Sequence, residues 1–187
     1  FNLDEYVGLS PSDPRSYHSY MRRHLFNHLD FTPQRIHLPR GDAPCAEQEA
    51  ERYNMSIEAA GGLDLAILGL GGNGHIGFNE PGVSHSSRTH VQALSAQTRA
   101  ANARYFGSAQ DVPRLAITMG IRTIFAATKL VVLATGAHKA AAVGAMLDGP
   151  VSTDCPASAR CRRVREAGHR CQHTDRGRQA NQERQRR

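Results

Sequence analysis

The stretch LDLAILGLGGNGHIGFNEPG, residues 63–82, joins an apolar run to a glycine-rich loop. The run 63–68 is continuous and lacks polar alternation, which is typical of a strand buried in a parallel sheet. Gly69, Gly71 and Gly74 then fit the spacing G-x-G-x-x-G, which opens many dinucleotide-binding turns. The stretch therefore predicts a strand that ends at a ligand-binding loop, and the residues after it must decide which ligand.

A dinucleotide loop requires a helix that starts within the glycines and an acidic residue about 20 positions further on. Pro81, Gly82 and the serine-rich segment 83–90 interrupt any such helix, and Thr89 and His90 stand where the acid is needed. The sequence therefore favours a catalytic loop over a nucleotide cradle.

His75 is the residue in this loop best suited to proton transfer, because imidazole titrates near neutral pH and can both donate and accept a proton. Glycines before it allow the backbone to approach a ligand closely. Asn73 and Glu80 flank it and could fix its tautomer and orientation.

The segments around the loop alternate between strand and helix patterns, which predicts an α/β fold: a three-layer, Rossmann-like domain with a mainly parallel sheet. In such a sheet, ligands bind beyond the carboxyl ends of the strands. Asp4-Glu5, the 69–82 loop and the segment 135–139 should meet there. The expected strands are the end of FNLDEY, 35–39, 63–68, 114–120 and 129–136. The expected helices are one within 10–30 that begins after Asp13 as N-cap, 46–60, 95–107, the segment from 120 to about 128, and 138–149.

The net charge of +6 is concentrated in residues 160–187, which hold ten arginines and three acidic residues. The remaining residues carry 13 basic and 14 acidic groups, so the body has no basic excess for nucleic acid. With Val164 as its one aliphatic residue larger than alanine, 160–187 is expected to be a disordered, arginine-rich tail beside a 1–159 domain. No apolar run approaches the length of a membrane span.

Four cysteines without a disulfide-like spacing indicate a reducing compartment, so we expect a cytoplasmic location. A metal cluster in the tail is disfavoured because the spacing matches no common zinc pattern. The residues concerned are Cys161, His169, Cys171 and His173.

Four segments together resemble the glucosamine-6-phosphate deaminase (glucosamine-6-phosphate isomerase) family: FNLDEYVGL, GLGGNGHIGFNEPG, SSRTHVQALSAQTRAANARYF and ATGAHKAAAVGAMLDGPVSTDCPAS. The FNEPG ending separates them from the related 6-phosphogluconolactonases. The resemblance implies conversion of glucosamine 6-phosphate and water to fructose 6-phosphate and ammonia, without organic cofactor or metal. It allows a monomer or a homo-oligomer.

The resemblance also implies roles for individual residues. Asp4 is expected to take the proton from C2 of the sugar and His75 to open the ring, with Asn73 and Glu80 as its partners. Some family members carry Asp where this chain has Asn73. Arg104 and Lys139 are expected to bind the sugar phosphate, Arg104 through a bidentate fork and Lys139 near a helix N-terminus.

Two departures from the family pattern lead to further expectations. The family's first strand and Gly-Thr-Ser-rich phosphate loop have no counterpart before FNLDEY, and the arginine-rich residues after 159 resemble translation in a shifted frame. Three alternatives therefore stay open: an enzyme for another hexosamine phosphate such as galactosamine 6-phosphate, an inactive sugar-phosphate-binding fragment, and a nucleic-acid binder acting through the tail. His90 and Gln92 replace basic residues of allosteric members, which argues against activation by the N-acetylated sugar phosphate.

Overall fold

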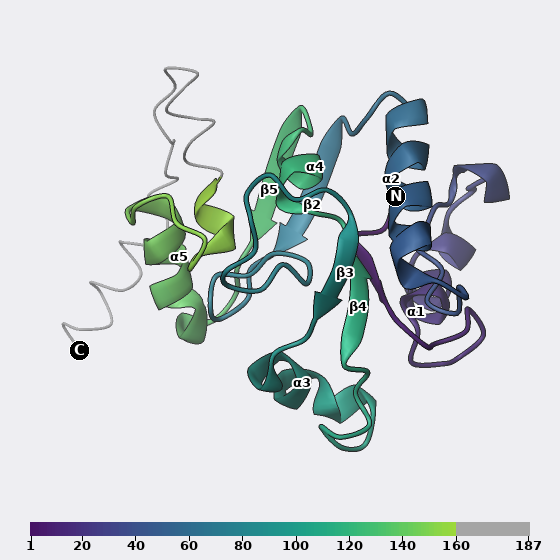
Figure 1. Cartoon of the computed structure of the whole chain (residues 1–187), viewed down its shortest axis with the longest axis horizontal. Coiled ribbons are helices and arrows are strands. Elements are labelled where there is room, and N and C mark those ends of the chain that lie inside the picture. Colours follow the sequence, from purple (N-terminus) through teal and green to yellow (C-terminus); the bar gives the residue numbers. More distant parts are fainter. Residues whose placement is uncertain (160–187) are drawn as a thin grey trace.

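The computed structural model describes residues 1–159, and Figure 1 shows them as helices packed around short strands. The expectations for the tail 160–187, including its cysteines and histidines, lie outside the described residues. None of the helices within 1–159 is long and apolar enough to cross a membrane.

The strand before the glycine loop is β2 (Leu65–Gly69), and it pairs in parallel with β5 (Lys129–Leu133). Leu65 lies opposite Lys129 and Gly69 opposite Leu133. The carboxyl ends of β2 and β5 therefore lie at the same edge of the strand pair. The glycine loop after β2 and the segment with η4 after β5 both begin at this edge. The parallel pair and its surrounding helices confirm the α/β fold class.

The other strands form a separate antiparallel sheet in the order β1-β4-β3. They are β1 (Asp4–Tyr6), β3 (His90–Ala93) and β4 (Leu115–Thr118), and both Asp4 and His90 pair with Thr118. The described strands are thus mixed rather than mainly parallel. The connection between β3 and β4 contains α3 (Ala96–Asn102) and η3 (Ala103–Tyr105), and the chain returns through it so that the two strands pair antiparallel.

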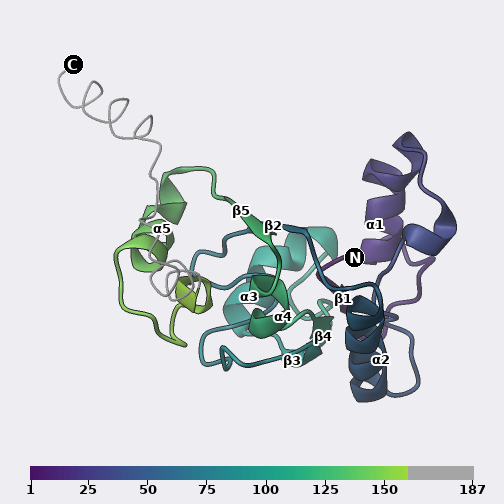
Figure 2. The ribbon, with the colours of Figure 1, turned by 90° about the horizontal axis from the view of Figure 1, so that it is seen from above.

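The α-helices are α1 (Tyr17–His24), α2 (Ala46–Ala59), α3 (Ala96–Asn102), α4 (Ile121–Phe125) and α5 (Ala140–Leu147). Short 3₁₀ turns are η1 (Phe26–His28), η2 (Pro33–Arg35), η3 (Ala103–Tyr105), η4 (Ala137–Lys139) and η5 (Pro156–Ser158). In Figure 2, β2 and β5 lie along one side of the molecule, with α4 on their inner side.

Two apolar clusters hold these elements together. The larger joins the inner face of β2 to α2 and α4 through Leu68, Tyr53 and Ile124, all fully buried. The smaller gathers aromatic rings around β1, where Tyr6 packs 5.2 Å from Phe78 between ring centroids. The second cluster fixes β1 against the residues that end the glycine loop.

Two local predictions are wrong. Asp13 does not cap the first helix: Ser16 does, with its hydroxyl accepting the Ser19 N–H at 3.1 Å, while Asp13 accepts from the backbone of Arg15. Both residue types favour this position, so composition did not decide between them. Residues 35–39 form no strand, because η2 takes up Arg35 and the remainder finds no paired ladder.

Candidate active site

The glycine loop leaves β2 at Gly69 and folds back on itself without forming a helix. The Gly71 N–H donates to the His75 carbonyl at 2.9 Å, and the Gly74 N–H donates to the Gly71 carbonyl at 3.1 Å. The next α-helix along the chain begins only at Ala96. A dinucleotide site needs a helix N-terminus within the loop, so the loop has the geometry of the catalytic alternative.

Gly71 is required because the His75 ring lies against its Cα, where a Cβ would overlap the imidazole. Gly77 adopts a φ of 56°, and a Cβ there would approach the Thr118 hydroxyl to 3.0 Å. These two glycines let the loop close tightly over the end of β4 and hold the imidazole in place.

His75, Asn73 and Glu80 form a hydrogen-bonded series. The His75 Nδ1 lies 2.6 Å from the Asn73 Oδ1, and the Asn73 Nδ2 donates to the Glu80 Oε2 at 3.2 Å. The His75 N–H also donates to the same Asn73 oxygen at 3.2 Å. Glu80 therefore orients His75 through the amide of Asn73.

This series assigns the tautomer of His75. An ionised carboxylate can only accept, so Glu80 faces the amino group of Asn73 and the amide oxygen faces the imidazole. That oxygen also only accepts, so the proton of neutral His75 lies on Nδ1 and the lone pair on Nε2. The ring thus offers a base to a ligand.

The protonation states agree with this arrangement. Burial lowers the pKa of His75, and the charge of Lys139 lowers it further, against an opposing effect from Glu80. Burial alone would raise the pKa of Glu80, but hydrogen bonds from Thr98, Ser95 and Asn73 outweigh it and lower the pKa. At neutral pH the site therefore contains a neutral imidazole and an ionised glutamate.

Asp4 begins β1 and lies beside the end of β4, so an antiparallel ladder positions it instead of the expected parallel neighbour. Burial, with a smaller contribution from the Glu5 carboxylate, raises the pKa of Asp4 to about 7. Asp4 as a whole residue is 8% exposed. A carboxylate with a pKa near neutrality suits a proton acceptor.

Glu5 attaches helix α1 to the strand that carries Asp4. Its carboxylate accepts the N–H groups of Tyr6 at 2.9 Å, Tyr17 at 3.1 Å and His18 at 3.0 Å. Tyr17 and His18 open α1, so Glu5 satisfies free donors at the helix N-terminus. Tyr17 is thereby held as a wall of the site beside Asp4.

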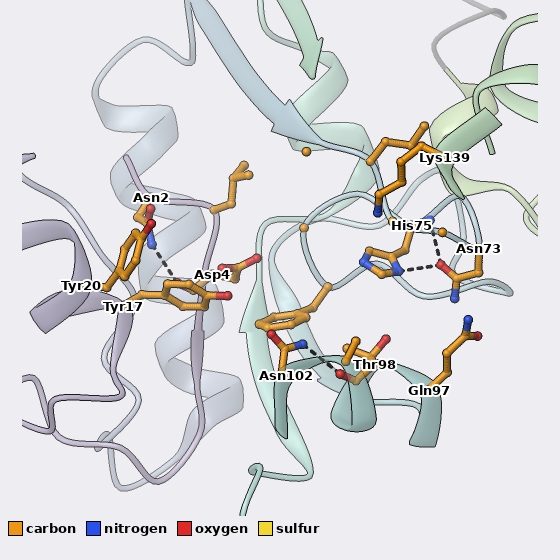
Figure 3. Close-up of a pocket in the computed structure, with 18 of the residues that line it drawn as sticks. Asn2, Asp4, Tyr17, Tyr20, Asn73, His75, Gln97, Thr98, Asn102 and Lys139 are labelled. Atoms are coloured by element: carbon orange, nitrogen blue, oxygen red, sulfur yellow. Dashed lines mark hydrogen bonds between the residues drawn. The ribbon is translucent and has the colours of Figure 1, made fainter. Parts of the chain in front are cut away.

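These groups surround a cavity of about 460 Å³, a size typical of small-molecule sites. Figure 3 shows Asp4 and His75 directed into it from opposite sides, with Lys139 close to His75. Lys139 follows β5 through η4, and the parallel register of β2 and β5 brings it to the glycine loop. The structure thus brings together Asp4, Asn73, His75 and Lys139, with Glu80 buried behind Asn73.

Arg104 is placed elsewhere. It is exposed on η3, stacks over the Tyr105 ring at 4.7 Å, and lines an adjoining cavity of about 590 Å³. Tyr17, Tyr20 and Asn102 line both cavities, so the two are neighbours. The predicted phosphate role of Arg104 stays a prediction.

Sequence reasoning missed several lining residues, including Asn2, Tyr17, Tyr20, Gln97, Thr98 and Asn102. The sequence signal for Thr98 was the helix N-cap three residues before it, because serine is a favoured N-cap residue. In the structure Ser95 caps α3 by accepting the Thr98 N–H, and the Ser95 N–H donates to Glu80 at 3.2 Å. The N-terminus of α3 therefore holds the carboxylate that orients His75. The aromatic residues of α1 carried no such pattern.

Comparison with known proteins identifies the family to which the chain is similar. A family model described as glucosamine-6-phosphate isomerases/6-phosphogluconolactonase matches residues 3–167. A glucosamine-6-phosphate deaminase of Rhodopirellula baltica is 55% identical over 158 residues, covering 84% of this chain and 63% of the relative. Glucosamine-6-phosphate deaminase 1 of Bacillus subtilis is 52% identical, covering 84% and 65%. The chain thus spans less than two thirds of the length of these relatives.

Solved structures give the same grouping. A monomeric glucosamine-6-phosphate deaminase superposes with a TM-score of 0.83 and 52% identity, over 84% of this chain and 66% of that one. A 6-phosphogluconolactonase from Thermotoga maritima superposes with a TM-score of 0.62 over 84% of this chain and 65% of that one. Its 23% identity shows a shared fold alone.

Proposed function

Because the chain belongs to the family of glucosamine-6-phosphate isomerases and 6-phosphogluconolactonases, we propose that it converts glucosamine 6-phosphate and water into fructose 6-phosphate and ammonia. The relatives named as deaminases are 50–55% identical, whereas the lactonase structures share only the fold. Of the two activities named in the family description, the deaminase reaction is therefore better supported than the lactonase reaction.

The observation that carries the proposal is the pairing of two proton-transfer groups across one cavity. Asp4 has a pKa of about 7, and His75 presents an unprotonated Nε2. An aldose–ketose isomerisation needs one group for ring opening and a second for the carbon-bound proton. In this proposal His75 is the group for ring opening and Asp4 is the group for the carbon-bound proton.

In ring opening, His75 Nε2 takes the proton of the anomeric hydroxyl and returns a proton to the ring oxygen as the C1–O5 bond breaks. The imidazolium formed in between keeps its Nδ1–H bond to Asn73, and the ionised Glu80 behind that amide stabilises the positive charge. A general acid–base group of this kind contributes about 10²–10⁴-fold to the rate.

In the isomerisation step, ionised Asp4 removes the proton from C2 of the open-chain sugar, and a proton is added at C1. The nitrogen then leaves C2 as ammonia after water adds to the resulting imine, which balances the overall equation. Asp4 must be deprotonated to begin, so activity is expected to increase as the pH rises through about 7.

The sugar phosphate is proposed to bind Lys139, whose ammonium lines the cavity near His75. Arg104 is retained as a second phosphate ligand. From its place on η3 it would reach the cavity past Asn102, which lines both cavities. The proposal includes a cytoplasmic location, which is supported by free thiols at Cys45 and Cys155. A homo-oligomer remains compatible with it.

The test is ammonia release from glucosamine 6-phosphate by the full chain, measured beside solvent deuterium incorporation at C2. Galactosamine 6-phosphate serves as the parallel substrate, because it differs at C4 alone. Deuterium exchange and ammonia release that both disappear in Asp4→Asn support the proposal. Saturable sugar-phosphate binding with neither reaction would establish the inactive binding fragment instead, and faster turnover of the C4 epimer would reassign the substrate.

A further inference from the structure

Thr118 lies in β4, the middle strand of the antiparallel sheet, and is paired on both sides. Asp4 of β1 lies opposite it in one ladder, and His90 of β3 lies opposite it in the other. The Met119 N–H also donates to the Leu3 carbonyl at 2.7 Å, so the attachment of β1 to β4 continues beyond Asp4. The backbone around Thr118 therefore determines where Asp4 stands at the catalytic cavity.

The side chain of Thr118 contacts the end of the glycine loop. Its hydroxyl oxygen accepts the Phe78 N–H at 3.1 Å, and the residue is fully buried. An ideal Cβ on Gly77 would lie 3.0 Å from this oxygen and 3.4 Å from Asp4 Oδ2, so the Gly77 backbone lies against both groups. Gly77 and Phe78 also line the catalytic cavity. Thr118 thus places Asp4 through its backbone and the adjoining part of the loop through its hydroxyl.

Asn79 provides a second attachment of the loop to the end of β4. Its side-chain amide donates to the Ile76 carbonyl at 2.8 Å and to the Met119 carbonyl at 2.9 Å. Ile76 and Asn79 flank the segment 77–78, so these bonds keep the loop on β4 without the help of Thr118. Removing the Thr118 hydroxyl should therefore loosen residues 77–78 without releasing the whole loop.

We propose that Thr118 is a positioning residue for the transfer of the C2 proton: its hydroxyl keeps residues 77–78 packed against the Asp4 carboxylate. The inference rests on the proposed role of Asp4 as the proton acceptor. Valine has the shape of threonine and suits a strand, but it offers no acceptor and leaves the buried Phe78 N–H without a partner. Serine keeps the acceptor.

The experiment compares Thr118→Val with Thr118→Ser in the full chain, with Thr89→Val as the matched control. Thr89 is also buried, and its hydroxyl has no hydrogen-bond partner in the described part of the chain. In solvent deuterium exchange at C2 of glucosamine 6-phosphate, Thr118→Val should lower kcat by about 10- to 100-fold with little change in KM. Thr118→Ser should recover most of the rate, and Thr89→Val should match the parent.

Amide hydrogen exchange by NMR tests the same contact without turnover. In the parent, the Phe78 amide should exchange at least about tenfold more slowly than that of Gly72, whose N–H has no acceptor within residues 1–159. Thr118→Val should remove this protection and Thr118→Ser should keep it. The midpoint of the Asp4 carboxyl titration should also fall from about 7 in Thr118→Val, because a loosened loop admits water to the carboxylate.

The outcomes separate this inference from the proposed function. A folded Thr118→Val with unchanged kcat, or with unchanged Phe78 exchange and Asp4 titration, overturns the inference. An unprotected Phe78 amide in the parent overturns it as well, and this measurement does not depend on the folding of any variant. A parent that exchanges no deuterium at C2 refutes the proposed function, whereas the Phe78 exchange and the Asp4 titration still decide whether Thr118 holds the loop against Asp4.

Discussion

Replacing Asp4 by asparagine should raise stability and abolish catalysis together. The pKa of Asp4 lies at about 7 in the folded protein against an ordinary value of 3.8. One pKa unit corresponds to about 1.4 kcal/mol, so keeping this buried carboxylate ionised costs up to about 4 kcal/mol of folding free energy. Asparagine has a similar shape and never ionises.

The direction in which stability changes with pH follows from proton linkage. Below pH 3.8 the carboxyl group is protonated in both folded and unfolded chains, and it has no effect on stability. Between 3.8 and about 7 the unfolded chain releases its proton while the folded chain retains it, so stability declines with rising pH. Above about 7 the loss is complete. Relative to the parent, Asp4→Asn should therefore gain stability between pH 4 and pH 8.

The assay is urea unfolding of both proteins at pH 4, 6 and 8, with C2 deuterium exchange measured on the same samples. Asp64→Asn is the matched control, because Asp64 is exposed and its side chain makes no hydrogen bond in the described structure. The control should change stability by no more than about 0.5 kcal/mol. A stability difference for Asp4→Asn that is the same at all three pH values would refute the assigned burial of the charge.

Four further changes test the rest of the site. Gly71→Ala places a Cβ in the volume of the His75 ring and should lower kcat by about 10²-fold with little change in phosphate affinity. An unchanged kcat would show that the position of the His75 ring does not depend on a glycine at residue 71. Asn73→Asp brings a carboxylate to His75 Nδ1 and should raise the His75 pKa in an NMR titration, and an unaltered titration would argue against the Nδ1–Asn73 bond. Lys139→Gln should raise KM for the sugar phosphate about ten- to one-hundred-fold at nearly constant kcat, whereas a loss confined to kcat would remove Lys139 from phosphate binding. Ser16→Ala should destabilise the fold by about 1 kcal/mol through the lost α1 cap. Ser16→Gly, which fits this fully buried position and is tolerated at N-caps, should cost less, and equal stability of the two variants would contradict the assigned cap.

The sequence was most informative where the polar site residues and the strand that positions them are adjacent in the chain. The strand, the glycines and His75 with its two partners lie within 63–82, so local pattern was enough to place them. Lys139 could be placed because parallel strands share a carboxyl edge. The antiparallel sheet was not predictable in the same way, because β1 and β4 pair across more than a hundred residues and β3 is short and polar. Arg104 depends on the orientation of a single 3₁₀ turn, which periodicity does not specify.

The neutral amide of Asn73 separates His75 from the charge of Glu80. A carboxylate in direct contact with the imidazole would favour its protonated form and raise the pKa of His75. Glu80 orients the Asn73 amide, and that amide orients His75. The negative charge of Glu80 is thereby separated from the imidazole by the length of one side chain. The histidine therefore stays neutral by burial, while Asp4 on the other side of the cavity has its pKa raised by burial to about 7. The same desolvation moves the two pKa values in opposite directions. As a result, His75 is an available base at neutral pH, and Asp4 ionises in the range where a carbon-bound proton can be taken and returned.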